Sequence, residues 1–313
     1  MKIIYLNNCW FTNVGEAFID IGGLYLTKSI FSESKVACIS AMTNYYVDLA
    51  NQKAGYHKIF KKNVKSEMYD LSDMSKHLMA DYVIMPGMLA TEEFLSAKSK
   101  FMVDKLHANG CKVVFLGLGG LKYDDKEREV FSRYLDEIQP EFVMTRDDVT
   151  YDNYKDVAPC VKGIDCAFWT IDQFDPRGFT FSNYDVVSFN RMGEPREFSS
   201  WQKEIIRPWH MQMDYSDEKY HKGILLSDTP LDYLTVYANA DFVYTDLVHA
   251  TIVSLMYGTP VKYWYFDKRS YAFDALNGLN KTSDGVLTIS AKNLKKQKEQ
   301  LMNELQLLVN KNS

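Results

Sequence analysis

Short apolar runs alternate with longer amphipathic segments along the chain. Because successive residues of each run are apolar, the runs predict strands buried on both faces, and the segments between them predict helices. This alternation is typical of βα units that assemble parallel sheets. The first series predicts strands over residues 3–6, 36–40, 82–85, 113–117 and 142–145, with helices over 17–31, 92–108 and 126–138.

A polar stretch that carries Pro176 and Gly178 then interrupts the alternation, as a linker between domains would. With 313 residues the chain is about twice the usual domain length of ~150 residues, which favours two domains. After the interruption, a second series predicts strands over 185–189, 223–226, 242–245 and 261–266, helices over 230–238 and 250–257, and a final leucine-striped helix over 291–309.

We therefore predict an α/β protein of two Rossmann-like domains with parallel sheets and a cleft between them, resembling the GT-B architecture. The N-terminal domain is expected to span residues 1–170, the linker 171–184 and the C-terminal domain 185–290. The terminal helix, within 291–313, would by analogy cross back to the first domain. Ligands of such sheets bind beyond the carboxyl ends of the strands, so the polar residues that follow each strand are the candidates for a site.

The charge and cysteine content exclude several classes of partner. The chain has 36 Lys and Arg against 41 Asp and Glu, a net charge of -5, so no positive field attracts nucleic acid. No apolar run approaches the ~20 residues of a membrane span, and the start lacks the apolar core of a signal peptide. We expect a cytoplasmic protein, with peripheral membrane contact left open. The five cysteines have no CxxC spacing, which indicates reduced thiols and no metal site.

A histidine lies at the junction of a predicted strand and helix in the second series. His249 would therefore lie at the carboxyl edge of the second sheet, with Asp246 three residues earlier as its orienting partner. Arg191 ends the first strand of this series, and Lys268 and Arg269 follow a later one, so positive charge is expected on the same rim. The alternative is a neutral His249 that only caps its helix.

The first series offers weaker candidates. Asn13, Gly15 and Glu16 lie between the first strand and its helix, where a glycine lets backbone N–H groups approach an anion at the positive helix end. A capped helix start explains the same residues equally well. Arg146 closes the fifth strand, and Asp165 lies where the first domain gives way to the second. Each of these two is either a substrate-binding residue or part of a network that braces the domains.

The order and spacing of these motifs resemble the polysaccharide pyruvyl transferase family from about residue 13 to about residue 269. Each matching piece is short, but together they are fairly specific. The similar positions are Asn13 to Glu16 (the family's Asn-x-Gly-Asp turn, with Glu for Asp), Arg146 with Asp147 and Tyr151, Gly163 to Asp165, Arg191, and 240–249 followed by Gly258, Thr259 and Pro260.

The resemblance implies a function. Members of the family transfer pyruvate from phosphoenolpyruvate to two hydroxyls of a sugar, forming a cyclic ketal on a surface polysaccharide or its lipid-linked precursor. The resemblance thus implies a transferase of polysaccharide biosynthesis that needs no metal or redox cofactor, with phosphoenolpyruvate as the donor substrate. It implies His249 as the acid/base or phosphate-contacting group and Arg191 as a cation that binds the donor.

The chain departs from the family pattern at Leu247, where the family has the arginine of an Arg-x-His motif. Losing a charge-assisted contact to an oxyanion costs roughly 3 kcal/mol of transition-state stabilisation, which leucine does not replace. Either Lys268 or Arg269 compensates, the donor differs, or catalysis has been lost. Two alternatives therefore stay open: a glycosyltransferase that uses a nucleotide sugar, and a catalytically silent member that binds a glycan or a partner enzyme.

Overall fold

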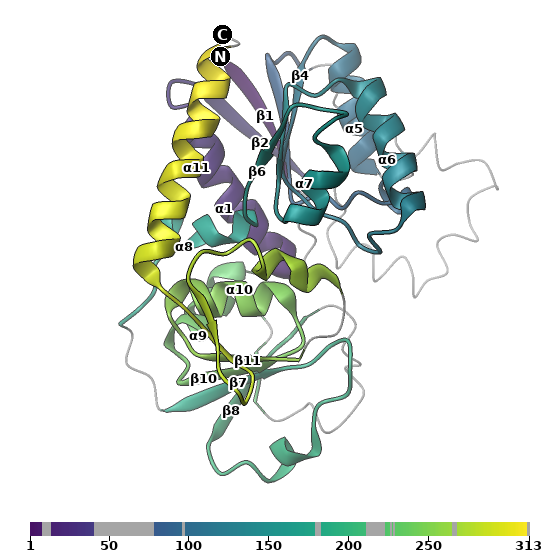
Figure 1. The fold of residues 1–313 in the computed structure, drawn as a ribbon. Helices are drawn as coiled ribbons and strands as arrows, with labels where there is room; N and C mark the ends of the chain where they lie inside the picture. The colour runs from purple at the N-terminus through teal and green to yellow at the C-terminus, as the bar shows by residue number, and fades with distance from the viewer. Residues whose placement is uncertain are drawn as a thin grey trace, which may run out of the picture.

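The computed structural model describes residues 1–7, 14–40, 78–95, 98–178, 183–210, 223–225, 227, 229–264 and 268–311. These residues form two mostly parallel β-sheets with flanking helices (Figure 1), which confirms the predicted α/β class. The first sheet has the strand order β2-β1-β3-β4-β5-β6, and every pair in it is parallel. Its elements are β1 (Lys2–Asn7), α1 (Val14–Ile30), β2 (Lys35–Ser40), β3 (Tyr82–Pro86), α4 (Glu92–Leu95), α5 (Lys98–Ala108), β4 (Lys112–Leu118), α6 (Asp125–Ile138), β5 (Phe142–Thr145), α7 (Asp148–Tyr154) and β6 (Cys160–Lys162).

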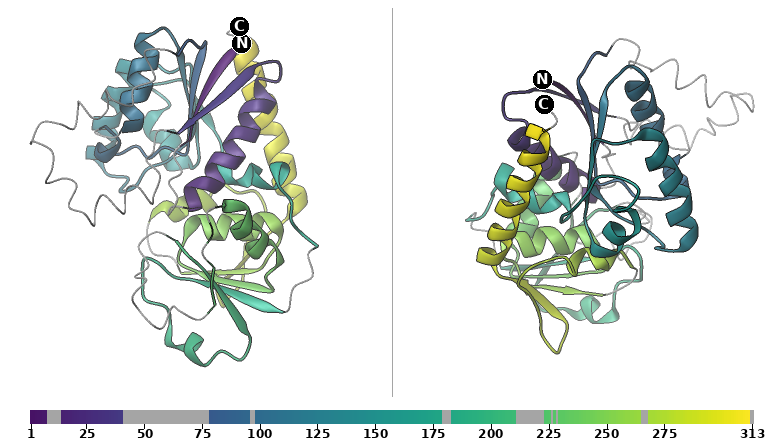
Figure 2. Two further views of the ribbon diagram at one scale, coloured as in Figure 1. Left: turned by 180° about the vertical axis from the view of Figure 1, so that it is seen from behind. Right: turned by 45° about the horizontal axis from the view of Figure 1, so that its top comes forward.

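Helices cover both faces of the first sheet, as Figure 2 shows from two further sides. Alternate residues of a strand point to opposite faces. Ile4 and Val83 belong to the core formed with α5 and α6, whereas Tyr5 and Ile84 belong to the core formed with α1. The strands are apolar at successive residues because neither face meets water.

The second sheet has the order β12-β13-β11-β10-β7-β8-β9 and is parallel except at one edge. There β13 pairs antiparallel with both β11 and β12, and a turn with Gly285 at φ +87° joins β12 and β13 as a hairpin. The elements are β7 (Tyr184–Ser188), η4 (Arg196–Ser200), β8 (Glu204–Pro208), β9 (Ile224–Leu225), α9 (Pro230–Asn239), β10 (Phe242–Thr245), α10 (Val248–Tyr257), β11 (Val261–Tyr263), η6 (Lys268–Phe273), β12 (Leu279–Lys281) and β13 (Val286–Ile289).

The apolar runs did not predict β6, β8, β12 or β13. These strands are short, and β8 begins at Glu204 and contains Arg207, so it lacks the continuous apolar run of a central strand. The strand expected over 223–226 is only the two-residue β9, and Leu226 lies outside the described residues. The strand expected over 261–266 ends at Tyr263 in β11, before residues that are also outside them.

Helix α1 is the element on which the two sheets meet. Besides the first sheet it contacts η3 (Cys166–Trp169), α8 (Thr170–Gln173), α9, α10 and the terminal helix α11 (Ala291–Lys311). Phe18 of α1 meets Tyr237 of α9 edge to face, with ring centroids 6.2 Å apart. One apolar core therefore runs through residues of both sheets, and the first turn of α1 is directed toward the second sheet.

The connection between the sheets begins as a helix, since α8 occupies the start of the polar stretch that the sequence predicted as a linker. Thr170 Oγ1 donates to the carbonyl of Phe18 at 2.9 Å, which ties α8 to α1. Helix α11 then runs back along α1 (Figure 1), and Gln306 Nε2 donates to the carbonyl of Ser29 at 3.1 Å. None of the helices in the described ranges combines the length and apolar character that crossing a bilayer requires.

Candidate active site

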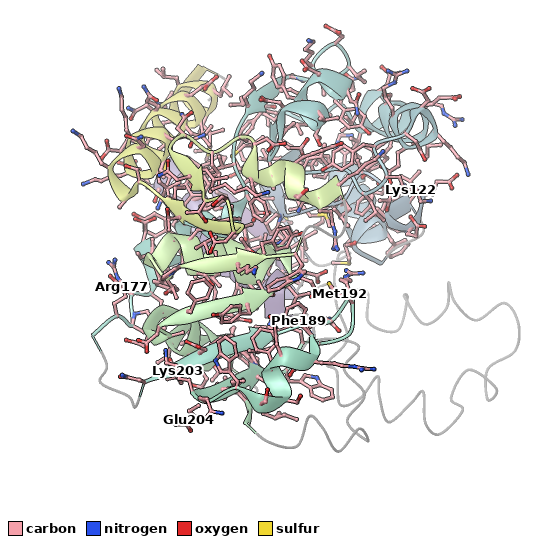
Figure 3. All side chains as sticks on the ribbon, turned by 60° about the horizontal axis from the view of Figure 1, so that its bottom comes forward. Lys122, Arg177, Phe189, Met192, Lys203 and Glu204 are labelled. Atoms are coloured by element: carbon pink, nitrogen blue, oxygen red, sulfur yellow. The ribbon has the colours of Figure 1, made fainter. Side chains whose placement is uncertain are left out.

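A cavity of about 100 Å³ lies between the carboxyl edges of the two sheets. Figure 3 identifies this edge of the second sheet: Phe189 and Met192, which follow β7, lie at one end of the strands, and Lys203 and Glu204 lie at the other. Open α/β sheets bind their ligands at the carboxyl edge. The cavity is lined by Gly15, Glu16, Ile19, Gly87, Leu89, Arg146, Asn190, Arg191, His210, Leu247, Val248, His249, Ala250 and Arg269.

Asp165 joins a buried arginine to the histidine at the cavity. Its Oδ2 lies 3.4 Å from Arg146 Nη1 and 3.6 Å from His249 Nε2. Its Oδ1 accepts from the backbone N–H of Ala167 at 3.0 Å, so the carboxylate is held at the start of η3. The aspartate is only 1% exposed. Burial by itself raises a carboxyl pKa, but the neighbouring His249 and the charge of Arg146 outweigh it, leaving the pKa of Asp165 lowered. The site therefore keeps a carboxylate anion beside the histidine.

Arg146 brings a buried cation to the first-sheet side of the cavity. Arg146 is 2% exposed. It follows β5, as the sequence predicted. Within the described residues, Nε and Nη2 are buried and donate no hydrogen bond. Buried donors of a charged group are costly to leave unsatisfied, so a guanidinium that lines a cavity in this state is suited to an anionic ligand.

His249 lies against the first turn of α1, at the meeting of two helix N-termini. A Cβ placed on Gly15 would lie 2.5 Å from His249 Nδ1, so only glycine admits the ring at this position. His249 itself is in the first turn of α10. The amino ends of both helices carry partial positive charge, which favours a negative ligand in the cavity.

Asp246 is not the partner of His249, and this sequence prediction is wrong. Its Oδ1 accepts from the backbone N–H of Asn190 at 2.9 Å, and its Oδ2 accepts from those of Arg191 and Met192 at 2.8 and 2.7 Å. None of its hydrogen bonds among the described residues goes to His249. Asp246 instead holds the turn after β7, and thereby places Arg191 at the cavity wall. The carboxylate beside His249 is that of Asp165, with Oδ2 3.6 Å from Nε2.

The two cationic residues after β11, Lys268 and Arg269, lie in different places. Arg269 lines the cavity, whereas the exposed Lys268 donates from Nζ to the carbonyl of Lys122 at 2.9 Å and is absent from the lining. Leu247 lines the cavity too, half-buried next to Val248. Of the two cations proposed to compensate for Leu247, only Arg269 is therefore at the cavity.

Sequence reasoning missed His210, a second histidine of the cavity. It follows β8, which the apolar pattern did not predict, and it is 5% exposed. Its Nε2 lies 2.9 Å from the hydroxyl of Tyr237. Burial, with a smaller contribution from the charge of His249, lowers the pKa of His210 to about 3. His210 is consequently a neutral ring at physiological pH.

The remaining predicted residues are placed as follows. Glu16 lines the cavity from the first turn of α1, next to Gly15. Asp147 caps α7: its Oδ1 accepts from the backbone N–H of Thr150 at 2.7 Å. Asn13 lies outside the described residues. The described chain brings no three His, Cys, Asp or Glu side chains together as a group that could hold a metal ion.

The fold and the cavity define a two-sheet α/β protein of the GT-B type, with a ligand site between the sheets. It is similar in structure to S. aureus MnaA in a co-structure with UDP (TM-score 0.55, 15% identity, 98% of this chain and 90% of that one). It is also similar to a UDP-GlcNAc 2-epimerase from Neisseria meningitidis bound to UDP-GlcNAc (0.53, 12%, 98% and 94%) and to one from Methanocaldococcus jannaschii (0.52, 14%, 96% and 92%). At these identities the similarity shows the fold alone.

The family is shown by sequence. The family model of the polysaccharide pyruvyl transferases matches residues 13–261, so the chain belongs to the polysaccharide pyruvyl transferase family. This match confirms the resemblance found in the motifs. Among proteins with curated descriptions, none matches the chain in sequence.

Proposed function

We propose that the protein transfers pyruvate from phosphoenolpyruvate to two hydroxyls of a sugar during the synthesis of a surface polysaccharide. The observation that carries the proposal is the buried Arg146, whose Nε and Nη2 donate no hydrogen bond within the described residues and whose side chain lines the cavity. Arg191 and Arg269 line the same cavity. Phosphoenolpyruvate offers a phosphate and a carboxylate to such cations, and arginine binds both through parallel N–H donors.

His249 and Asp165 are placed to move the protons of this reaction. One sugar oxygen bonds to C2 of the donor while the methylene carbon gains a proton. The second sugar oxygen then displaces phosphate, which leaves a cyclic ketal and inorganic phosphate. His249 is the proton-transferring residue, and the Asp165 carboxylate, 3.6 Å from Nε2, orients the ring and stabilises its protonated form. The donor is a reactant, and the proposal includes no metal or redox cofactor.

The acceptor belongs to the same proposal as a sugar or a lipid-linked glycan, reached from the cytoplasm with at most peripheral membrane contact. The test is a thermal-shift and transfer panel of phosphoenolpyruvate, UDP and UDP-sugars on the full chain. Ligand binding raises the melting temperature by mass action, so phosphoenolpyruvate should raise it, and less so at high salt. Arg191→Ala should weaken donor binding, whereas Arg196→Ala, which removes an exposed arginine outside the cavity lining, should not. Stabilisation by UDP and not by phosphoenolpyruvate would favour a glycosyltransferase and reject the proposal.

One observation favours a second candidate, a catalytically silent member that binds a glycan or a partner enzyme. Leu247 lines the cavity where the family pattern has an arginine. The same panel separates this candidate from the first. Binding of phosphoenolpyruvate together with release of phosphate in the presence of acceptor supports the transferase, and binding without turnover over the whole acceptor panel supports the silent member.

A further inference from the structure

His210 lies in the cavity wall and has no role in the proton transfers assigned to His249 and Asp165. Its ring packs edge to face against Tyr233 and contacts Tyr237, and Tyr237 is itself fully buried in α9. The carbonyl of Tyr237 accepts from Thr259 Oγ1 at 2.9 Å, which fixes the backbone that carries the phenol. The 2.9 Å contact between the Tyr237 hydroxyl and His210 Nε2 therefore holds the ring in one orientation.

A neutral imidazole has one N–H donor and one acceptor nitrogen. In His210 the nitrogen Nε2 is committed to Tyr237, and among the described residues Nδ1 has no hydrogen-bond partner. A buried ring that stays neutral around pH 7 serves neither as a general acid nor as a general base there. What it offers to a ligand of the cavity is one hydrogen bond from a fixed ring.

We propose that His210 binds the donor substrate: the Tyr237 hydroxyl donates a hydrogen bond to Nε2, and the N–H at Nδ1 donates a hydrogen bond to an anionic oxygen of phosphoenolpyruvate. This inference rests on the proposed function. It follows from the lining of the cavity, where Arg146, Arg191 and Arg269 favour an anion. An anion accepts hydrogen bonds only, so the ring must present N–H on the cavity side. Tyr237 is compatible with this tautomer, because its hydroxyl can donate to the other nitrogen, Nε2.

Two substitutions of His210 distinguish the roles of its two ring nitrogens. In His210→Asn the side-chain amide nitrogen reaches the position of Nδ1 and loses the contact to Tyr237, whereas in His210→Gln the terminal amide reaches the position of Nε2 and leaves the cavity without a donor. We expect His210→Asn to bind phosphoenolpyruvate within about 3-fold of the parent and His210→Gln to bind it roughly 10- to 100-fold more weakly, the effect of one hydrogen bond to a charged group. The melting temperature should be higher for His210→Gln than for His210→Asn, because only His210→Gln retains the hydrogen bond to Tyr237.

Isothermal titration calorimetry with phosphoenolpyruvate, together with melting curves of the same full-length proteins, is the experiment. If His210 had only a structural role, the affinity of the variants for phosphoenolpyruvate would follow their thermal stability. A His210→Gln variant that binds phosphoenolpyruvate as tightly as His210→Asn, or more tightly, therefore overturns this inference and leaves the proposed function standing. A parent protein that does not bind phosphoenolpyruvate rejects the proposed function and this inference with it. Tyr237→Phe is the second test if either variant fails to fold: it frees the tautomer, and we expect donor affinity to fall several-fold with KM rising more than kcat falls. Unchanged affinity in this variant also overturns the inference.

Discussion

The side chain of His249 lies so close to Gly15 that any side chain larger than hydrogen at position 15 would clash with it. A Cβ there would lie 2.5 Å from Nδ1 and 3.1 Å from Cβ of the histidine. The two residues come from helices that follow strands of different sheets, Gly15 from α1 and His249 from α10. The glycine is thus required by the close approach of His249 to the first turn of α1.

Gly15→Ala is expected to displace the His249 ring and to lower pyruvyl transfer by about 100-fold, the usual effect of a misplacement near 1 Å in an active site. The measurement is kcat for phosphate release from phosphoenolpyruvate with a saturating acceptor. Gly23→Ala is the matched control: its Cβ would lie 2.4 Å from the Tyr5 hydroxyl, an equally close contact in the same helix but outside the cavity lining. Both variants should lose stability, and equal losses of activity would contradict a specific role of Gly15.

Asp165→Asn is expected to destabilise the fold by about 3–5 kcal/mol, because it leaves Arg146 as an uncompensated buried charge. The pKa of Asp165 is lowered in the folded protein, so its contribution to stability is present above the unfolded value near 3.8 and is lost as pH falls through the folded value. The difference in unfolding free energy between parent and variant should therefore be complete above about pH 5 and shrink at lower pH. Urea denaturation at several pH values measures it.

Asp175→Asn provides the comparison for that experiment. The pKa of Asp175 is also lowered, mainly by its hydrogen bond to Arg177, but this pair is exposed. Exposed ion pairs contribute less than about 1 kcal/mol. A loss in Asp165→Asn as small as that in Asp175→Asn would show that Arg146 is satisfied without the aspartate.

The sequence predicted the parts of the fold that have local causes. Long amphipathic segments such as α6 and buried runs such as β5 repeat their pattern over neighbouring residues, so one window contains the signal. The hairpin of β12 and β13 and the strand β8, between β7 and β9, have no such run, and their pairing depends on the strands already in place. The carboxyl-edge rule predicted that Arg191 and His249 share one pocket with Lys268 and Arg269 on its rim, and the cavity is lined by Arg191, His249 and Arg269 but not by Lys268.

The pairings inside the site could not be predicted in the same way. Asp246 is three residues from His249 in sequence, which suggested a pair, yet the backbone N–H groups after β7 occupy both of its oxygens. Asp165 is far from His249 in sequence and reaches it only because α1 and η3 bring the two sheets together. His210 carried no motif at all. Contacts of this kind depend on how the two sheets pack together, which no local pattern encodes.

Arg269→Ala should weaken the binding of phosphoenolpyruvate by roughly 10-fold or more, because Arg269 lines the cavity and contributes a charge-assisted contact there. Lys268→Ala should leave donor affinity unchanged, since its ammonium binds the carbonyl of Lys122. Lys268 and Arg269 are adjacent and carry the same charge, so their long-range electrostatic attraction of the donor is nearly equal. Calorimetry that finds the two variants equally weakened would mean that only the net charge of the rim matters.

Leu247→Arg tests whether the chain is an impaired member of its family. Leu247 lines the cavity two residues before His249, and a guanidinium there would hold phosphate through two parallel N–H bonds. If the other groups are in place, pyruvyl transfer should rise by at least 10-fold, and Leu247→Gln, similar in length but uncharged, should not reproduce the gain. If the cavity has been rebuilt for another ligand, the new cation is unpaired and lowers stability by roughly 2 kcal/mol or more without any activity. Phosphate release from phosphoenolpyruvate over galactose-, glucose- and N-acetylmannosamine-containing acceptors separates these outcomes, and a well-folded arginine variant no more active than the parent contradicts the impaired-transferase explanation.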